Sequence, residues 1–380
     1  MHITNKFDPR FGYAEFYLAK KQRELGLDVC VVSSDRDIYG NRQFRPTSNR
    51  IEGIDVYRIE SLFEARGNVW PLKPFELVRI INSFSPNIIH CRGLLNPLAQ
   101  EALLLKRSYK YKVVADLITG ISPLTFILLP KFKFFFNFWI SSKVDAFFAC
   151  NKAVEEFLIK NMNIPQKKVY FIPLAADHEL FKPNNSRREK TRSRLGLLPE
   201  DVVAIYTGKF LPSKRIHDLL IASKPIIKEN RRFKILLVGD GPEDYKEKLK
   251  SIIGELGITN NVLVIKTVHR SELPNFYNAA DFAVWPGTFS ISIIEAMACG
   301  LPIIIAKSDW ASHYLEYENG YSFKAGDIYN LSSLLLTLVN DDKARRRMGM
   351  RSRKLVEDKL NWNAIVNKYI GVYESVMEIQ

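Results

Sequence analysis

Asp281–Ala306, which reads DFAVWPGTFSISIIEAMACGLPIIIA, is the stretch that decides the expected fold. Residues 282–285 form an apolar run typical of a buried strand, and residues 286–290 are small, polar and turn-forming. Residues 291–299 have helical periodicity, and a second apolar run at 302–306 predicts another strand. A strand, a tight loop, a short helix and a strand form the repeating unit of a parallel α/β sheet.

Glu295 is the one acidic residue in the helix expected at 291–299. Two interpretations of this side chain are open. Ser292 and Glu295 have the spacing of a capping box, in which the carboxylate bonds back to a backbone amide. Alternatively the carboxylate holds a ligand, because ligands of parallel α/β sheets bind where helix N-termini meet the carboxyl ends of strands.

A basic loop, GKFLPSKR at residues 208–215, lies between an expected strand and an expected helix. Cations near a helix N-terminus are disfavoured by the helix dipole, by roughly 0.3–1 kcal/mol each. This conflict with local rules favours an anion site formed by Lys209, Lys214 and Arg215 over a solvated basic loop. An anion site in the same domain favours the ligand interpretation of Glu295.

Further candidate ligand residues lie in the first half of the chain. Gly12 follows the first expected strand, where it is either a turn glycine or a point of close approach for a ligand. His90 and Arg92 lie at the carboxyl end of a strand expected at 87–91, although His90 is equally consistent with a core histidine. In the second half, residues 239–242 read GDGP and not GxGxxG, which disfavours a nicotinamide dinucleotide.

A polar, charged stretch, PNNSRREKTRSR, divides the chain at about residue 186. Strands and helices alternate on both sides of it, which is typical of the α/β class. We therefore expect an N-terminal domain at 1–185 and a second domain at 186–360. A C-terminal helix within 361–380 is long and amphipathic enough to pack back across the first domain.

Two segments depart from this alternation. Residues 34–70 are polar and irregular, with a single strand expected at 54–59. Residues 122–143 contain six phenylalanines and a tryptophan between lysines. This composition is typical of an interfacial contact with an anionic membrane surface, but it also fits a core helix packed under the sheet, and both interpretations stay open.

The composition is that of an ordinary globular protein with a strong basic bias. The chain has 380 residues, of which 47% are hydrophobic, and its net charge is +14, which favours an anionic partner. No arginine-rich tail, RNP-like strand pair or zinc-finger spacing is present, so we expect no nucleic-acid partner. The four cysteines are widely spaced and are expected to be buried free thiols.

We expect a cytoplasmic protein, with peripheral attachment to the inner face of the cell membrane as an option. The N-terminal residues MHITNKFDPRFGY lack the apolar core of a signal peptide. No stretch reaches the approximately 18 apolar residues that a membrane-spanning helix needs.

Taken together, these motifs resemble those of the group 1 (family 4) glycosyltransferases, and the resemblance covers nearly the whole chain. The matching segments are PRFGYAE (9–15), NIIHC (87–91), IPLAADHELFKP (172–183), Gly208-Lys209 with Lys214, VGDGP (238–242) and FSISIIEAMACGLP (289–302). The resemblance implies the GT-B fold, in which two doubly wound, Rossmann-like domains face a central cleft.

The resemblance also implies an activity. The protein would transfer a sugar from a nucleotide-sugar to a glycan or lipid-linked acceptor, with retention of anomeric configuration. The synthesis of a cell-surface polysaccharide or glycolipid is the expected setting. Neither a metal nor another cofactor is implied, because the nucleotide-sugar is a co-substrate.

Carried over residue by residue, the resemblance assigns roles in donor binding. Lys209 and Lys214 would neutralise the diphosphate, and Glu295 would hold the ribose hydroxyls. These three residues would form the catalytic centre. The remaining donor-binding positions would be Gly12 and Gly208 at the phosphates, Val268 and His269 at the base, and Phe289, Ser290, Ile291 and Ser292 at the phosphate and sugar.

Two departures from the family pattern concern the transferred sugar. Gly287 stands where the family has a first glutamate, eight residues before Glu295, and the loss of that side chain would leave a space. Thr119-Gly120 stands where many members have a histidine. We therefore name His90, Arg92, Asp116 and Gly287 as the candidate sugar and acceptor side. The departures keep open a second hypothesis: a catalytically impaired relative that binds a nucleotide or glycan as a partner protein.

Overall fold

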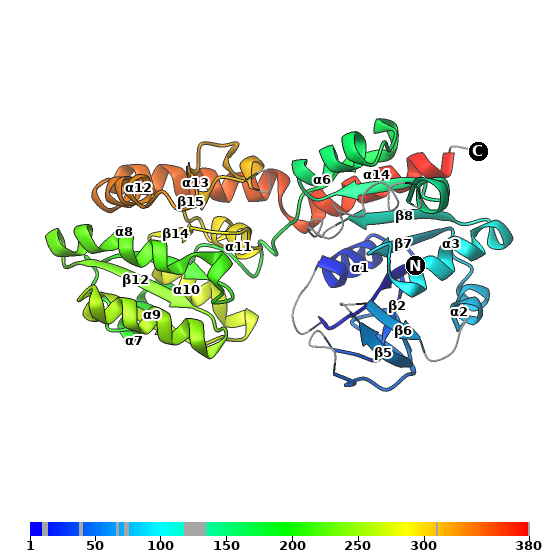
Figure 1. Cartoon of the computed structure of the whole chain (residues 1–380), viewed down its shortest axis with the longest axis horizontal. Helices are drawn as coiled ribbons and strands as arrows, with labels where there is room; N and C mark the ends of the chain where they lie inside the picture. Colours follow the sequence, from blue (N-terminus) through cyan, green and yellow to red (C-terminus); the bar gives the residue numbers. More distant parts are fainter. Residues whose placement is uncertain are drawn as a thin grey trace. The chain divides into compact units, whose positions relative to one another are not determined.

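The computed structural model of the chain contains two compact units (Figure 1). It describes residues 1–9, 14–37, 41–65, 68–71, 76–117, 134, 136–308 and 311–378. Met1–Leu174 and Trp362–Gln380 form the first unit, and Ala175–Asn361 forms the second. Gly12, Thr119-Gly120 and most of the aromatic segment 122–143 lie outside the described residues.

The first unit is built on an eight-stranded sheet with the order β10-β9-β8-β7-β1-β2-β4-β3. Every neighbouring pair is parallel except β3 with β4. The strands are β1 (His2–Thr4), β2 (Cys30–Ser34), β3 (Ser48–Ile51), β4 (Ile54–Ile59), β7 (Ile88–Arg92), β8 (Lys112–Leu117), β9 (Ala146–Ala149) and β10 (Val169–Phe171). All residues of β2 and β9 are buried, as in a parallel sheet covered on both faces.

The helices of this unit are α1 (Ala14–Glu24), α2 (Glu76–Phe84), α3 (Pro97–Tyr109), α6 (Lys152–Glu156) and α14 (Trp362–Glu378), with π-helical turns at Phe136–Ser141 and Phe157–Asn161. Although α14 comes at the end of the chain, it belongs to this unit and packs beside α1. The Tyr17 and Trp362 rings stack with their centroids 5.4 Å apart, at an interplanar angle of 8°.

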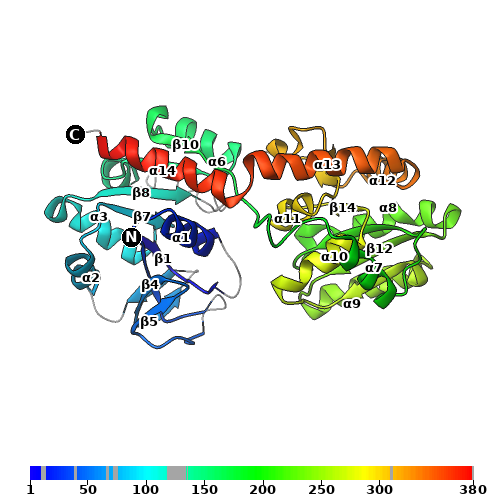
Figure 2. The same ribbon diagram turned by 180° about the vertical axis from the view of Figure 1, so that it is seen from behind.

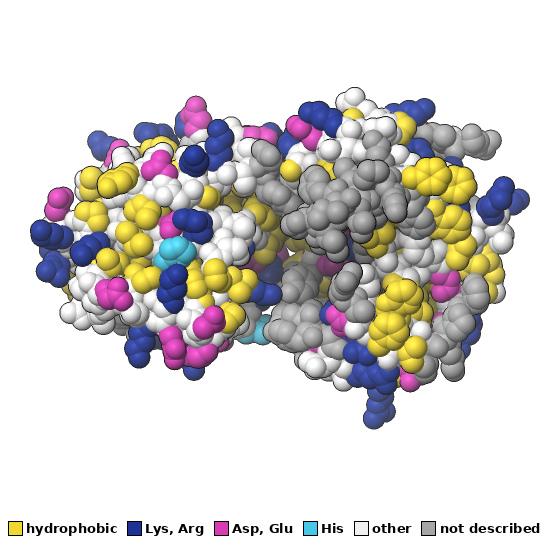
Figure 3. Space-filling model, in the orientation of Figure 1, with side chains coloured by type: hydrophobic (Ala, Val, Ile, Leu, Met, Phe, Trp, Pro, Cys, Tyr) yellow, Lys and Arg dark blue, Asp and Glu magenta, His cyan; other side chains and the backbone are white. Residues whose placement is uncertain are grey.

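Residues 34–70 contain more strands than the sequence predicted. The edge strand β3 has a polar sequence, SNRI, and is largely exposed, so it lacks the apolar alternation that marks a strand. Farther on, β5 (Ser61–Ala65) and β6 (Asn68–Pro71) form a separate two-stranded antiparallel sheet. Its exposed hydrophobic side chains gather in one patch over β5 and β6 (Figure 3), where the Phe63 and Trp70 rings stack 5.8 Å apart.

The second unit is built on a six-stranded, fully parallel sheet with the order β13-β12-β11-β14-β15-β16. The strands are β11 (Val202–Thr207), β12 (Phe233–Val238), β13 (Val262–Ile265), β14 (Phe282–Trp285), β15 (Ile303–Ala306) and β16 (Gly320–Phe323). The chain runs outward from β11 to β13 and then returns to β14 on the other side of β11. The carboxyl ends of β11 and β14 therefore mark a topological switch point, where ligands of open α/β sheets bind.

Helices cover both faces of this sheet. They are α7 (Asn185–Arg194), α8 (Ile216–Glu229), α9 (Glu243–Glu255), α10 (Leu273–Ala279), α11 (Ser292–Ala298), α12 (Ile328–Asn340) and α13 (Asp342–Lys359). In Figure 1, α8 and α9 lie in front of the sheet, and in the reverse view of Figure 2 α7 and α10 lie in front of it. This arrangement is the doubly wound topology that the sequence predicted.

The division between the units lies earlier than the expected boundary at residue 185. The segment after Leu174 packs into the second unit. The Phe181 ring lies 5.9 Å from the Tyr277 ring, edge to face, and Arg353 donates to the backbone carbonyls of His178 and Phe181. Its side-chain contacts, and not its irregular backbone, decide to which unit the segment belongs.

Across the described ranges, no helix combines the length and the apolar character needed to cross a membrane.

Candidate functional site

The site in the second unit is built around α11, the helix that the opening stretch of sequence predicted. All seven of its residues are buried, although it contains Ser292 and Glu295. The preceding strand ends at Trp285, whose indole N–H donates to the backbone carbonyl of Thr207 at 2.9 Å. This bond joins the carboxyl ends of β14 and β11 at the switch point.

Glycines let the loops at this edge of the sheet pack backbone against backbone. The Gly208 residue has a φ of +138°, which disfavours any side chain. A Cβ on Gly239 would lie 1.9 Å from the Gly208 carbonyl oxygen, and one on Gly241 would lie 2.0 Å from that of Phe210. The loops after β11 and β12 therefore pack backbone against backbone at these glycines, and the Phe210 N–H donates to the Asp240 carbonyl at 2.7 Å.

Gly287 locks the loop after β14 onto the loop after β11. A Cβ at this position would lie 2.3 Å from the Ser213 carbonyl oxygen and 2.6 Å from the Lys214 carbonyl carbon. The Thr288 N–H also donates to the Ser213 carbonyl at 3.0 Å. We expected a space where the first glutamate is missing, and this expectation is wrong: neighbouring backbone fills the position, and no side chain fits on it.

Lys214 reaches from the loop after β11 to the loop after β14. Its ammonium group donates to the backbone carbonyls of Thr288, at 3.1 Å, and of Phe289, at 2.6 Å. Burial, and to a lesser extent repulsion from Lys209, lowers the pKa of Lys214. An ammonium group has three donors, so one remains for a ligand, and no carboxylate forms an ion pair with Lys214 within the described ranges.

The other two cations of the basic loop differ from each other. The side chain of Lys209 is exposed, and the described part of the structure gives it no ion pair. Arg215, in contrast, lies at the N-cap of α8 and donates from Nε to the Asp218 carboxylate at 2.6 Å. The anion-site prediction therefore rests on Lys209 and Lys214, because Arg215 is neutralised within the protein.

The Glu295 carboxylate is bound by two side chains from the β13–β14 connection. Its Oε1 accepts from Arg270, from Nη2 at 2.9 Å and from Nε at 3.2 Å, and its Oε2 accepts from the Tyr277 hydroxyl at 3.4 Å. The capping-box interpretation is wrong, because α11 begins at Ser292, whose hydroxyl donates to the Thr207 carbonyl at 3.0 Å. Burial raises the pKa of Glu295, and Arg270 opposes that shift.

The remaining donor-binding candidates lie around these groups. Phe289 stacks on Tyr314 with centroids 5.4 Å apart. The hydroxyls of Ser290 and Ser292 are hydrogen-bonded at 2.5 Å, and Ile291 is 40% exposed.

The two residues expected at the base follow β13. Val268 is half-buried, and the exposed His269 ring accepts through Nδ1 from the Ser271 amide at 3.4 Å. Apart from Gly12, all the expected donor residues therefore lie in loops at the carboxyl edge of one sheet, or in the first turns of α11.

Sequence reasoning missed Arg270 and Tyr277. Arg270 lies 25 residues before Glu295, and no spacing rule connects two such positions. Tyr277 has the pattern of a core aromatic residue, and its hydroxyl also contacts the Thr207 hydroxyl at 2.7 Å. A useful signal was available for Arg270 alone, because it directly follows the two residues expected at the base.

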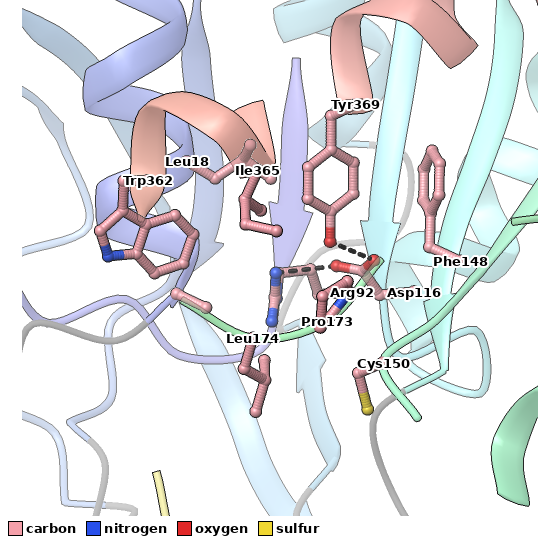
Figure 4. Close-up of a pocket in the computed structure, with 11 residues that line it drawn as sticks. Leu18, Arg92, Asp116, Phe148, Cys150, Pro173, Leu174, Trp362, Ile365 and Tyr369 are labelled. Carbon is pink, nitrogen blue, oxygen red and sulfur yellow. Dashed lines mark hydrogen bonds and ion pairs between the residues drawn. The ribbon is translucent and has the colours of Figure 1, made fainter. Parts of the chain in front are cut away.

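In the first unit, Arg92 and Asp116 lie together at the carboxyl ends of β7 and β8 (Figure 4). Arg92 Nη1 lies 2.7 Å from Asp116 Oδ2, and Arg92 Nε lies 3.2 Å from the Glu15 carboxylate. The Tyr369 hydroxyl of α14 donates to Asp116 Oδ1 at 3.1 Å. Burial alone would raise the pKa of Asp116, but Arg92 and His90 hold it at about 2.

His90 completes this cluster. Its Nε2 lies 3.2 Å from Asp116 Oδ2, and its Nδ1 is 2.7 Å from the Tyr373 hydroxyl. His90, Arg92 and Asp116 are 1%, 7% and 3% exposed. The structure therefore favours the core interpretation of His90 and gives all three side chains partners within the unit, where they hold α14 on the sheet.

All four cysteines are free and buried, as predicted. Among the residues whose placement is described, no group of three or more His, Cys, Asp or Glu side chains is arranged to hold a metal ion.

Two family models match the chain. The model described as "Glycosyl transferases group 1" matches residues 187–355, and the model described as "Glycosyltransferase Family 4" matches residues 16–180. The two matches correspond to the second and the first unit, respectively.

Two curated relatives show the range of the sequence matches. The chain is 27% identical over 218 residues to N-acetyl-alpha-D-glucosaminyl L-malate synthase of Bacillus anthracis, which covers 53% of this chain and 56% of that protein. It is 24% identical over 380 residues to the capsular polysaccharide biosynthesis glycosyltransferase CapM of Staphylococcus aureus, with 94% and 92% covered. The chain thus spans little more than half the length of the first relative.

A solved structure gives the fold. HepE of Anabaena, in complex with UDP, matches with a TM-score of 0.79 at 18% identity, covering 98% of this chain and 99% of that chain. This likeness confirms the predicted fold class, GT-B with two Rossmann-like domains.

Proposed function

Because the chain belongs to the group 1 glycosyltransferases, we propose that it transfers a sugar from a nucleotide-sugar to a glycan or lipid-linked acceptor. Retention of anomeric configuration and independence of a metal are part of the proposal. The observation that carries it is the carboxyl edge of the second sheet, where Lys214 contacts the loop after β14 and that loop leads into α11 with its buried Glu295. The UDP-bound state of HepE supports a nucleoside diphosphate as the leaving group.

The diphosphate is the part of the donor that needs positive charge. When the glycosidic bond breaks, negative charge grows on the leaving phosphate, and fixed donors stabilise it best in a site that excludes water. We assign this role to Lys214, whose two carbonyl contacts hold the ammonium group in place and leave its third N–H for a phosphate oxygen. Lys209 adds a second, more exposed charge.

The ribose is the part that Glu295 recognises in this proposal. A carboxylate oxygen accepts hydrogen bonds from vicinal hydroxyls, and Oε2 of Glu295 has one weak partner at 3.4 Å. The backbone around Phe289–Ser292 meets the phosphate and the sugar. Val268 and His269 flank the base, next to this ribose position.

The acceptor side of the proposal is a cell-surface polysaccharide or glycolipid. The match to CapM over 94% of this chain supports this class. We place the protein in the cytoplasm, where nucleotide-sugars are available to it, with peripheral attachment to an anionic membrane surface.

The described part of the aromatic segment 122–143 supports that attachment. Phe134 and Phe138 are 73% and 74% exposed and stack in parallel 6.0 Å apart, while Phe136 is buried. Lys143 lies over the Trp139 ring at 3.2 Å. The segment therefore has both a core face and an exposed face that combines aromatic rings with a cation, as interfacial helices do. Co-flotation with vesicles that contain anionic lipid tests the membrane attachment. Undiminished vesicle binding by the Phe134→Ser/Phe138→Ser protein would contradict it.

The second candidate is a non-catalytic, nucleotide-binding relative, which the missing first glutamate favours. No side chain fits at Gly287, so this chain has no substitute for that carboxylate at this position. Tight nucleotide binding without turnover on any acceptor would favour this candidate over the enzyme.

The deciding experiment measures release of nucleoside diphosphate from a panel of nucleotide-sugars, with lipid-linked and glycan acceptors. We expect release by the wild-type protein and strong loss in Lys214→Ala and Glu295→Gln. Lys250→Ala is the matched control, because Lys250 is an exposed lysine on α9. Activity that survives both site substitutions would overturn the assignment.

A further inference from the structure

We propose that Arg270 is a positioning residue that holds Glu295 in place for the ribose hydroxyls of the nucleotide. The inference rests on the proposed function, because it needs a nucleotide in the second unit. Arg270 comes from the turn before α10, and Glu295 comes from α11. Their contact therefore joins two connections that are far apart in sequence.

The two carboxylate oxygens of Glu295 have different hydrogen-bond partners. The two hydrogen bonds that Arg270 donates to Glu295, from Nη2 and from Nε, both go to Oε1. Among the described residues, the other oxygen, Oε2, accepts one long hydrogen bond, from the Tyr277 hydroxyl at 3.4 Å. Arg270 therefore occupies Oε1 and leaves Oε2, with its two lone pairs, as the acceptor for a diol.

Glu295 needs this partner because it is buried. The residue is 4% exposed on a helix whose other residues, except Ser292, are apolar, and an unpaired carboxylate is strongly disfavoured there. The titratable and charged groups that face it are Arg270, Tyr277 and Asp177, together with Cys299 on the same helix. Arg270 is the cation in this group and lowers the pKa of Glu295, whereas the charge of Asp177 raises it.

Arg270 is itself held in position. Its guanidinium group lies 4.9 Å from the centre of the Phe181 ring, and its side chain is 16% exposed. An arginine directs two N–H groups at one acceptor, which a lysine cannot do, so Lys at this position would fix the carboxylate less well. Because Arg270 directly follows Val268 and His269, it connects the base side of the proposed site with the ribose side.

The experiment compares a nucleoside diphosphate with its 2′-deoxy form. UDP, GDP and ADP are first titrated into the wild-type protein by calorimetry, and the tightest ligand is paired with its 2′-deoxy counterpart. We expect the wild-type protein to prefer the ribose form roughly ten- to a hundredfold, as for hydrogen bonds to a charged group. Glu295→Gln should lose most of this preference.

Arg270→Met should lose the preference near neutral pH and regain it as the pH rises. Without the guanidinium, the carboxyl group stays protonated to a higher pH, so the preference should appear at a higher pH than in the wild type. The preference of Arg270→Lys for the ribose form should lie between those of the wild type and Arg270→Met. Arg231→Met, a substitution at an exposed arginine, should leave the ratio of ribose to 2′-deoxy affinity unchanged. Because Arg270→Lys keeps the charge, it provides the same test if Arg270→Met does not fold.

A wild-type ratio in both Arg270 variants, at every pH, would overturn the inference and leave the proposed function intact. The proposed function fails differently: no nucleoside diphosphate would bind the wild-type protein, or binding would be indifferent to Lys214→Ala. A change in overall affinity with an unchanged ratio would also overturn the inference, because a merely structural arginine affects both ligands equally.

Discussion

The carboxyl edges of the two parallel sheets contain similar residues, but their charges are balanced differently. In the first unit, Arg92 lies between Glu15 and Asp116, and Asp116 also contacts His90 and Tyr369. Each charge there has a partner within the unit. In the second unit, Lys214 donates to neutral carbonyls, and Lys209 has no ion pair in the described ranges.

Two sheet edges with similar residues can therefore have different roles. A cluster whose charges are paired within the protein stabilises the fold, because removal of one partner leaves the other charge buried and uncompensated. A cluster with surplus positive charge at a switch point is prepared for an anion. The comparison predicts that substitutions in the first unit reduce stability and that those in the second reduce donor binding.

The largest expected effect is on the stability of the first unit. Asp116→Ala leaves Arg92 buried with Glu15 as its remaining partner, and breaking a buried ion pair costs roughly 3–5 kcal/mol. Urea-induced unfolding followed by circular dichroism measures the loss. Asp28→Ala is the control, because Asp28 is an exposed carboxylate of the same unit and should change little. Equal stability of the two variants would show that the cluster is not structural.

Gly287 is expected to give the next largest effect. Gly287→Ala places a methyl group 2.3 Å from the Ser213 carbonyl oxygen, and overpacking of this kind costs roughly 1–3 kcal/mol. The carbonyls of Thr288 and Phe289, which accept hydrogen bonds from Lys214, lie in the same loop as Gly287 and should be displaced. Donor affinity should therefore fall as well. Gly287→Glu, which restores the family motif, should bind donor less tightly than the wild type. Higher turnover in Gly287→Glu would contradict the closed geometry.

Acid should weaken the first unit through Asp116. Folding lowers the pKa of Asp116 from 3.8 to about 2, so the carboxylate contributes roughly 2 kcal/mol above pH 4. Because the folded-state pKa is the lower one, this stabilisation is lost as the pH falls from about 4 to 2. Asp116→Asn should flatten that part of the stability–pH curve. If the stability–pH curve of Asp116→Asn is the same as that of the wild type, Asp116 does not cause the loss of stability in acid.

The smallest effect is expected at Lys209. The side chain is exposed, so its contribution to diphosphate binding is screened by solvent and salt. Lys209→Ala should weaken binding less than Lys214→Ala, and the difference from wild type should shrink as ionic strength rises. Calorimetry at low and high salt measures both. A Lys209→Ala defect that exceeds that of Lys214→Ala would reverse the assigned importance of the two lysines.

Much of the second unit could be predicted from the sequence, because its elements have strong local signals. The strand and the helix expected on either side of the basic loop are present as Val202–Thr207 and Ile216–Glu229, and α11 is one residue shorter at each end than expected. In the first unit, β3, β5 and β6 were missed, since short and exposed strands have no apolar periodicity.

The contacts of the candidate site could not be predicted to the same degree. The sequence shows that Gly287 replaces a glutamate. It does not show that the Ser213 backbone fills the space beside Gly287. The partner of Glu295 is Arg270, and that pairing depends on where α10 and α11 pack. His90, Arg92 and Asp116 lie at strand ends, as binding residues do, and only their partners on α1 and α14 show that they are enclosed.

The two sheet edges are distinguished most directly by titrating one nucleoside diphosphate into one variant of each edge. We expect Lys214→Ala to bind at least tenfold more weakly than wild type, with unchanged thermal stability. Asp116→Asn should bind within twofold of wild type while melting at a lower temperature. The opposite pattern, with full affinity in Lys214→Ala and lost affinity in Asp116→Asn, would place the donor site in the first unit and contradict the assignment of Lys214.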